Sequence, residues 1–204
     1  MQIKFNKIKN NPIYSVAILF IIATVVTLAL STANALTKDK IAEQALIAEQ
    51  NARLKVFASA QTFEVYPKDE WPSENTGVDS VIKAFNDSNE LQGLIIVSKA
   101  RGYGGNVFTM SGITLEGKLV GFLVLSDNET PGLGKKVSLP NFTSKFIDKN
   151  PWLLFSLSQR DDTVNYIDAI SGATISSRAM IDSANIAVSF AKTITEKLQN
   201  GGDK

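Results

Sequence analysis

The sequence contains neither cysteine nor histidine among its 204 residues. Without them the chain cannot form a disulfide, an ordinary zinc site or a histidine-based catalytic triad, and it cannot ligate haem or an iron–sulfur cluster through these side chains. We therefore expect no metal site, and any redox chemistry needs an organic cofactor. The absence of cysteine is compatible with an oxidising compartment but does not identify one.

The sequence also lacks an excess of either charge. It has 21 Lys and Arg residues and 20 Asp and Glu residues, which gives a net charge of +1 at pH 7. No long-range field would attract nucleic acid, so nucleic acid is excluded as an expected partner. The acidic residues show no paired spacing typical of an acid/base dyad, and we expect no catalytic residues. Hydrophobic residues make up 44% of the chain, enough for one globular domain and an additional segment.

An uncharged segment near the N-terminus is the strongest physical signal. Residues 13–36 carry no charge, and as a helix they would span roughly 36 Å, against about 30 Å for the hydrocarbon core of a bilayer. Lys4, Lys7 and Lys9 precede this segment, so the positive-inside rule predicts that residues 1–12 are cytoplasmic. We expect a single-pass helix in the lipid bilayer of the cell (inner or cytoplasmic) membrane, with the C-terminal domain on the extracytoplasmic side.

Two alternatives concern this region. A basic start, an apolar stretch and Ala33-Asn34-Ala35 also match a cleaved signal peptide, although we expect a retained anchor. Residues 37–57 are rich in helix formers and predict a helical stalk. The same pattern fits an amphipathic helix folded into the domain, and the sequence does not separate the two.

The remaining residues, 58–204, predict one α+β domain. Residues 66–78 contain two prolines and a glycine and indicate a loop. Short apolar runs separated by turn sequences then predict an antiparallel sheet, with strands at residues 81–85, 91–98, 107–113 and 119–125. Helices are expected at residues 142–149 and 176–198. A sheet followed by helices is typical of the α+β class.

The segment "DAISGATISS", residues 168–177, places small and hydroxylated residues before the last predicted helix. The simplest interpretation is a helix entry in which Ser171 is the N-cap, because its hydroxyl can accept from the unpaired N–H groups of the first turn. Asp168 would hold the loop by bonding backbone N–H groups, or it would help a modifying enzyme to bind.

Asp168 with the four residues 171–174 resembles the flavinylation motif of a known FMN-binding domain. That domain occurs in the G subunit of Rnf-type ion-translocating ferredoxin:NAD oxidoreductases and in the C subunit of sodium-translocating NADH:quinone oxidoreductases. In this family a separate flavin transferase attaches FMN to the last threonine through a phosphoester. The resemblance implies covalent FMN on Thr174, with Ser171, Gly172 and Ala173 beside it. The chain length favours the G subunit.

The segment "ETPGLG", residues 129–134, is a second element of the resemblance, because in relatives it forms a loop against the bound flavin. Pro131-Gly132 is by itself a type II turn signal, and a plain tight turn is the alternative. The resemblance implies further cofactor-binding residues in this loop: Glu129, Thr130, Gly132, Leu133 and Gly134. Residues 102–105, rich in glycine, lack the lysine and hydroxyl of a phosphate-binding loop and are expected to join two strands and border the flavin.

These observations predict a membrane-anchored subunit that relays electrons through covalent FMN and works with the other subunits of a membrane redox complex. By resemblance, that complex passes electrons from ferredoxin to NAD and moves sodium or protons. The alternatives are a subunit of a sodium-translocating NADH:quinone oxidoreductase or another extracytoplasmic flavoprotein, and a cofactor-free anchored scaffolding or binding domain. Trp71 and Trp152 are expected to be packing residues.

Overall fold

The computed structural model describes residues 12–71, 77–158 and 163–200. The chain divides into two compact units, which meet between Glu49 and Gln50. Residues 1–11 lie outside the described residues, and with them the three lysines on which the predicted orientation depends.

One continuous helix, α2 (Pro12–Val56), contains both the predicted membrane segment and the predicted stalk. The helix is long and apolar enough to cross a membrane. Four threonine hydroxyls donate to the carbonyl oxygens one turn earlier, which satisfies them inside the helix: Thr24, Thr27, Thr32 and Thr37.

The C-terminal end of α2 belongs to the second compact unit. Ala52 and Val56 are buried in a core cluster on one face of the sheet. Gly112 and Gly121 are paired across two neighbouring strands, and a Cβ at either position would collide with the carbonyl oxygen of Val56. The helix therefore packs closely on these glycines. The last residues of α2 are therefore part of a helix folded into the domain, which was the alternative to a stalk.

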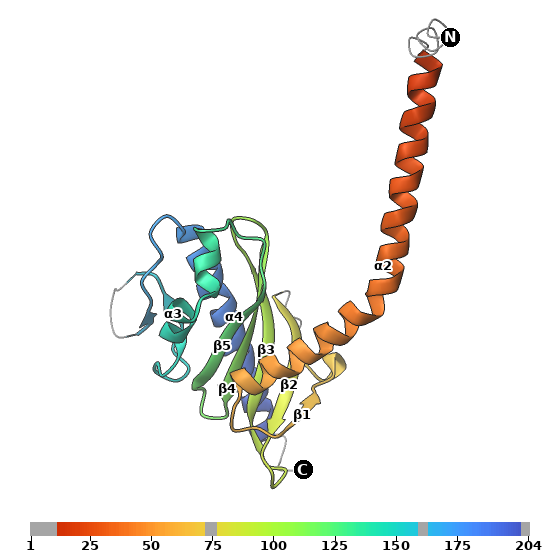
Figure 1. Cartoon of the computed structure of the whole chain (residues 1–204). Coiled ribbons are helices and arrows are strands. Elements are labelled where there is room, and N and C mark those ends of the chain that lie inside the picture. The colour runs from red at the N-terminus through yellow and green to blue at the C-terminus, as the bar shows by residue number, and fades with distance from the viewer. Residues whose placement is uncertain (1–11, 72–76, 159–162, 201–204) are drawn as a thin grey trace, which may run out of the picture. The chain divides into compact units, whose positions relative to one another are not determined.

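Five antiparallel strands form a sheet in chain order, as Figure 1 shows. They are β1 (Thr62–Val65), β2 (Val78–Phe85), β3 (Leu91–Arg101), β4 (Asn106–Thr114) and β5 (Leu119–Ser126). The predicted antiparallel sheet is confirmed. The predicted loop at residues 66–78 contains a short 3-10 helix, η1 (Lys68–Glu70), and ends where β2 begins.

The long helix α4 (Thr174–Asn200) packs on the opposite face of the sheet from the end of α2. It begins two residues before the predicted start. Its contact with the sheet includes three fully buried hydroxyls from Ser98, Thr109 and Ser183. Ser183 Oγ lies 2.9 Å from the Ser98 hydroxyl and 2.5 Å from the Thr109 hydroxyl. These bonds satisfy polar groups that would be costly to bury alone, and they fix α4 against β3 and β4.

The short helix predicted around residues 142–149 begins two residues earlier and does not extend to residue 149. The chain forms only a short helix, α3 (Pro140–Thr143), between two 3-10 turns, η2 (Gly134–Ser138) and η3 (Ser144–Phe146). The backbone is already extended at Ile147, and Asp148 has φ of 58°, so the helix cannot continue. Phe142 and Phe146 are buried by this arrangement, with ring centroids 5.7 Å apart.

A second, two-stranded sheet connects this region to α4. It pairs β6 (Phe155–Ser156) with β7 (Asn165–Tyr166) in parallel. The Asn185 amide, on α4, accepts from the N–H of Phe155 and donates to its carbonyl oxygen. Both tryptophans pack against the main core, as predicted, and the rings of Trp71 and Phe190 meet edge to face at 5.2 Å.

Candidate functional site

A tight turn leads into α4. Ala173 donates its N–H to the carbonyl oxygen of Ile170 at 2.9 Å. Gly172 has φ of 76°, the left-handed conformation that the third position of a type II turn requires. Ser171 occupies the second position of this turn, three residues before the helix begins at Thr174. The predicted N-cap role of Ser171 is therefore wrong, because the turn displaces it from the end of the helix.

The three hydroxyls in the first turn of α4 have different surroundings. Ser177 is fully buried and accepts a hydrogen bond from the N–H of Ile170 at 3.0 Å, which ties the turn to the helix. Ser176 is also buried. Thr174 is exposed, and within the described part of the chain its hydroxyl makes no hydrogen bond. It is therefore the hydroxyl of this turn that a modifying enzyme can reach.

The second predicted segment, residues 129–134, forms the expected type II turn. Leu133 donates its N–H to the carbonyl oxygen of Thr130 at 3.2 Å, and Gly132 has φ of 78°. A second bond, from the N–H of Lys135 to the same oxygen, extends the turn into η2. Leu133 is exposed at the tip of this loop.

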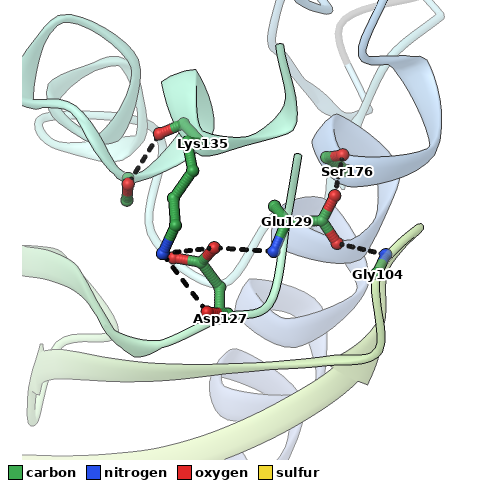
Figure 2. Close-up of polar contacts among 6 residues, drawn as sticks. Gly104, Asp127, Glu129, Lys135 and Ser176 are labelled. Atoms are coloured by element: carbon green, nitrogen blue, oxygen red, sulfur yellow. Dashed lines mark hydrogen bonds and ion pairs between the residues drawn. The ribbon is translucent and has the colours of Figure 1, made fainter. Parts of the chain in front are cut away.

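Glu129 connects this loop to two other segments, as Figure 2 shows. Its side chain is buried, with the residue 2% exposed. Ser176 donates its hydroxyl to Oε2 at 2.5 Å, and Gly104 donates its N–H to Oε1 at 3.1 Å. The carboxylate thus joins the loop to the first turn of α4 and to the connection between β3 and β4.

Asp127, the residue that follows β5, supports Glu129. Its Oδ1 accepts from the backbone N–H of Glu129 at 3.0 Å and forms an ion pair with Lys135 at 3.0 Å. Lys135 also donates to the carbonyl oxygen of Asp127. These contacts close the loop on itself and fix the direction in which Glu129 leaves it (Figure 2).

The three segments surround a cavity of about 520 Å³. Its lining contains seven of the nine predicted cofactor-binding residues, and the full set is Tyr103, Glu129, Thr130, Leu133, Gly134, Gly172, Ala173, Thr174, Ile175 and Ser176. Ser171 and Gly132 do not line it: each occupies a position in a turn. The glycine-rich connection reaches the cavity through Tyr103. Sequence reasoning missed Ile175 and Ser176, although both lie within the quoted motif.

The arrangement suits a flat ring that carries a phosphate. The volume falls within the range of small-molecule sites, about 300–1,000 Å³. Leu133 and Ile175 offer apolar side chains, Tyr103 offers an aromatic ring, and all three are exposed around the opening. Thr174 starts a long helix, where free N–H groups and the helix dipole favour an anion.

Asp168, the first residue of the motif, does not line the cavity. Its Oδ1 accepts a hydrogen bond from the Tyr166 hydroxyl at 2.8 Å, in place of the expected bonds from backbone N–H groups. This bond and the negative charge of the carboxylate raise the pKa of Tyr166 above its ordinary value of 10.0. Asp168 thus holds the chain between β7 and the turn through a side-chain contact.

Comparisons with known proteins agree with this geometry. Residues 102–189 match the FMN-binding domain family. The chain is 31% identical over 157 residues to the G subunit of the proton-translocating ferredoxin:NAD(+) oxidoreductase complex of Clostridium ljungdahlii, covering 76% of this chain and 78% of that protein. It is 29% identical over 190 residues to the G subunit of the Na(+)-translocating ferredoxin:NAD(+) oxidoreductase complex of Acetobacterium woodii, covering 88% and 91%.

Among solved structures, the fold is similar to that of the C subunit of the Na(+)-translocating NADH-quinone reductase from Parabacteroides distasonis. The TM-score is 0.50 at 19% identity, and the match covers 67% of this chain and 78% of that one. This likeness concerns the fold alone.

Proposed function

The chain belongs to the family of G subunits of ion-translocating ferredoxin:NAD(+) oxidoreductase complexes, and on this premise we propose that it relays electrons through FMN esterified to Thr174. It is an FMN-binding, electron-transfer subunit of an oxidoreductase complex, and the other subunits of that complex are its partners. The ester on Thr174, the flavin transferase that forms it and the extracytoplasmic position of the domain are parts of the proposal.

One observation carries the proposal. Two segments about 40 residues apart in the sequence, each expected to contact the flavin, meet around one cavity with Thr174 on its wall. A plain helix entry and a plain tight turn would have no reason to meet at a cavity. The exposed Thr174 hydroxyl supports modification at this residue, because its neighbours Ser176 and Ser177 are buried and hydrogen-bonded.

The position of Thr174 also suits the phosphate of the ester. As the first residue of α4 it lies where backbone N–H groups have no partner inside the helix. Favourable interaction of an anion with such a helix end amounts to about 0.3–1 kcal/mol when it is exposed, and more when it is partly buried. The small residues Gly172 and Ala173 leave the approach to the hydroxyl open.

Bound FMN would supply the redox chemistry, and the protein would supply position and surroundings. Leu133 and Ile175 would exclude water from the ring, and Tyr103 would cover part of it from the β3–β4 connection. A covalent tether keeps the cofactor on the domain when the surrounding solution contains no free FMN. The apolar part of α2 would hold the chain in the bilayer as a single retained span.

The test is mass spectrometry of the full-length chain, produced together with a flavin transferase and extracted from membranes. The wild-type chain should carry the mass of one FMN ester and show flavin fluorescence after denaturation. Thr174→Ala should lose both. Thr130→Ala is the matched control, because Thr130 is another exposed threonine on the same cavity wall, and this variant should keep both.

Two outcomes would contradict the proposal. A wild-type chain without flavin would instead support the alternative of an anchored binding domain that has no cofactor. Flavin retained on Thr174→Ala would place the ester elsewhere, with Ser171, Ser176 and Thr130 as the next hydroxyls to replace.

A further inference from the structure

The ester proposed on Thr174 leaves the buried carboxylate of Glu129 without an assigned role. This carboxylate nevertheless lines the cavity, only 2% of the residue is exposed, and its two hydrogen bonds come from donors on two other segments. A carboxylate in such a position would be costly to bury without a function, because burial of a charge is unfavourable unless it is well paired.

The nearest loop lysine does not neutralise Glu129. Lys135 forms its ion pair with Asp127, and in the described ranges 12–71, 77–158 and 163–200 the Glu129 carboxylate forms no ion pair with a lysine or arginine. A hydroxyl and a peptide N–H orient the charge but do not cancel it. The field of this carboxylate therefore acts on whatever occupies the cavity.

The surrounding glycines indicate that the site is built to hold a carboxylate. A Cβ at Gly102 would collide with Oε1 of Glu129, and a Cβ at Gly134 would collide with Oε2 and lie 2.8 Å from Ser176 Oγ. Gly102 is the first residue of the β3–β4 connection, and Gly134 is the first residue of η2. Both segments can approach the carboxylate because neither has a side chain there.

We infer that Glu129 is a positioning residue that holds the three cavity segments together and that its charge lowers the reduction potential of the flavin bound there. The inference rests on the proposed function, since it needs a flavin in this cavity. It adds to that function a determinant of the potential at which the protein passes electrons.

The physical reason is repulsion between like charges. If a flavin bound here took up two electrons from the redox partners in the complex and one proton, its ring would gain one negative charge. A fixed carboxylate in the wall of the same cavity disfavours that gain, and the effect is larger in a partly desolvated site than in water. Removal of the charge should therefore make reduction easier.

Glu129→Gln tests the charge with the contacts kept. The glutamine oxygen can still accept from the N–H of Gly104, and its NH₂ group can donate to the Ser176 hydroxyl, which then acts as the acceptor. Asp127→Asn is the matched control, because it removes a carboxylate from the same loop whose charge is already paired with Lys135 and which does not line the cavity. Ser176→Ala removes one hydrogen bond and keeps the charge.

The measurement is a spectroelectrochemical titration of the flavin-loaded full-length chain in detergent. We expect a positive shift of the midpoint potential in Glu129→Gln that is clearly larger than the shift in Asp127→Asn. Ser176→Ala should show no positive shift. Equal shifts in Ser176→Ala and Glu129→Gln would mean that the lost hydrogen bond, and not the lost charge, changes the potential, and this result would contradict the inference.

The positioning part has a readout that needs no flavin. In the chain produced without a flavin transferase, Glu129→Ala should increase amide hydrogen exchange in residues 170–177, whereas Glu129→Gln should resemble the wild type. Equal exchange in the wild type and in Glu129→Ala would overturn this part.

The two proposals can fail separately. A loaded wild-type chain whose potential is unchanged by Glu129→Gln would overturn the inference and leave the proposed function intact. A wild-type chain that takes up no flavin would overturn the proposed function and, with it, the effect of Glu129 on the potential.

Discussion

The backbone N–H of Ile170 donates a hydrogen bond to the hydroxyl of Ser177 at 3.0 Å, across the turn that precedes α4. This bond joins the residue before the turn to the first turn of the helix, with Thr174 between the two bonded residues. The preceding residue, Ser176, donates a hydrogen bond to Glu129 and so connects the motif to the "ETPGLG" loop. The first turn of α4, which contains Thr174, is therefore held by two adjacent serines: Ser177 bonds the residue before the tight turn, and Ser176 bonds the loop.

Ser177→Ala should destabilise the domain. Ser177 is fully buried, so its replacement leaves the N–H of Ile170 without its partner, at a cost of about 1–3 kcal/mol. For a chain of this size, each kcal/mol corresponds to a decrease of about 2–4 °C in the midpoint of thermal unfolding. Differential scanning fluorimetry of the detergent-solubilised chain measures the midpoint of thermal unfolding. Ser189→Ala, an exposed serine on the same helix, should change the midpoint little; equal midpoints in the two variants would contradict the role of the bond.

Asp168→Asn should lower the pKa of Tyr166. The carboxylate stabilises the neutral phenol, because only the neutral form can donate the hydrogen bond and because the phenolate would be repelled. In the wild type, the folded-state pKa lies above 10.0, so this contact stabilises the fold fully below pH 10 and its contribution is lost as the pH rises through the folded pKa. Difference absorbance of tyrosinate during a pH titration of both proteins measures the shift. Identical titration curves would show that Asp168 does not act on Tyr166.

The sheet and α4 could be predicted because their signals are local. Apolar runs alternate with turn sequences along residues 78–126, and one apolar face continues through α4. The strand β1 gave no such signal, since most of its residues are exposed and it exists through pairing with β2, in which Thr62 lies opposite Phe85. The two-residue strand β6 likewise depends on a distant side chain, that of Asn185, which bonds the backbone N–H and carbonyl oxygen of Phe155.

The candidate site could be predicted in part for the same reason. The sequence identifies Thr174 and the "ETPGLG" loop as short motifs, but it does not reveal which side chains bond across the cavity. Ser176 and Glu129 are 47 residues apart, and only the packing of α4 on the sheet brings them together. The role of Ser171 was mispredicted because Gly172 permits a turn that ends before the helix starts.

An impermeant lysine reagent applied to intact cells tests the orientation of the chain. With the domain outside, the exposed Lys136 and Lys192 should be labelled, and Lys4, Lys7 and Lys9 should be protected. Lysis before labelling should modify both groups and serves as the control for reactivity. The reverse pattern in intact cells would place Thr174 in the cytoplasm.

The last prediction contrasts two glycines of the "ETPGLG" loop. Gly132→Ala should lower the stability of the domain by about 1–2 kcal/mol, because alanine is strained at φ of 78°. It should leave the ester and the flavin spectrum unchanged, since a Cβ there meets no atom within 4 Å and Gly132 does not line the cavity.

Gly134→Ala should have the opposite profile. A Cβ at Gly134 would collide with the Glu129 carboxylate, so this variant should displace the carboxylate from Ser176 and change the flavin spectrum even where the domain stays folded. Thermal unfolding and absorbance spectra of both variants, loaded with flavin, separate the two effects. A changed spectrum in a well-folded Gly132→Ala variant would mean that the ring reaches the tip of the loop.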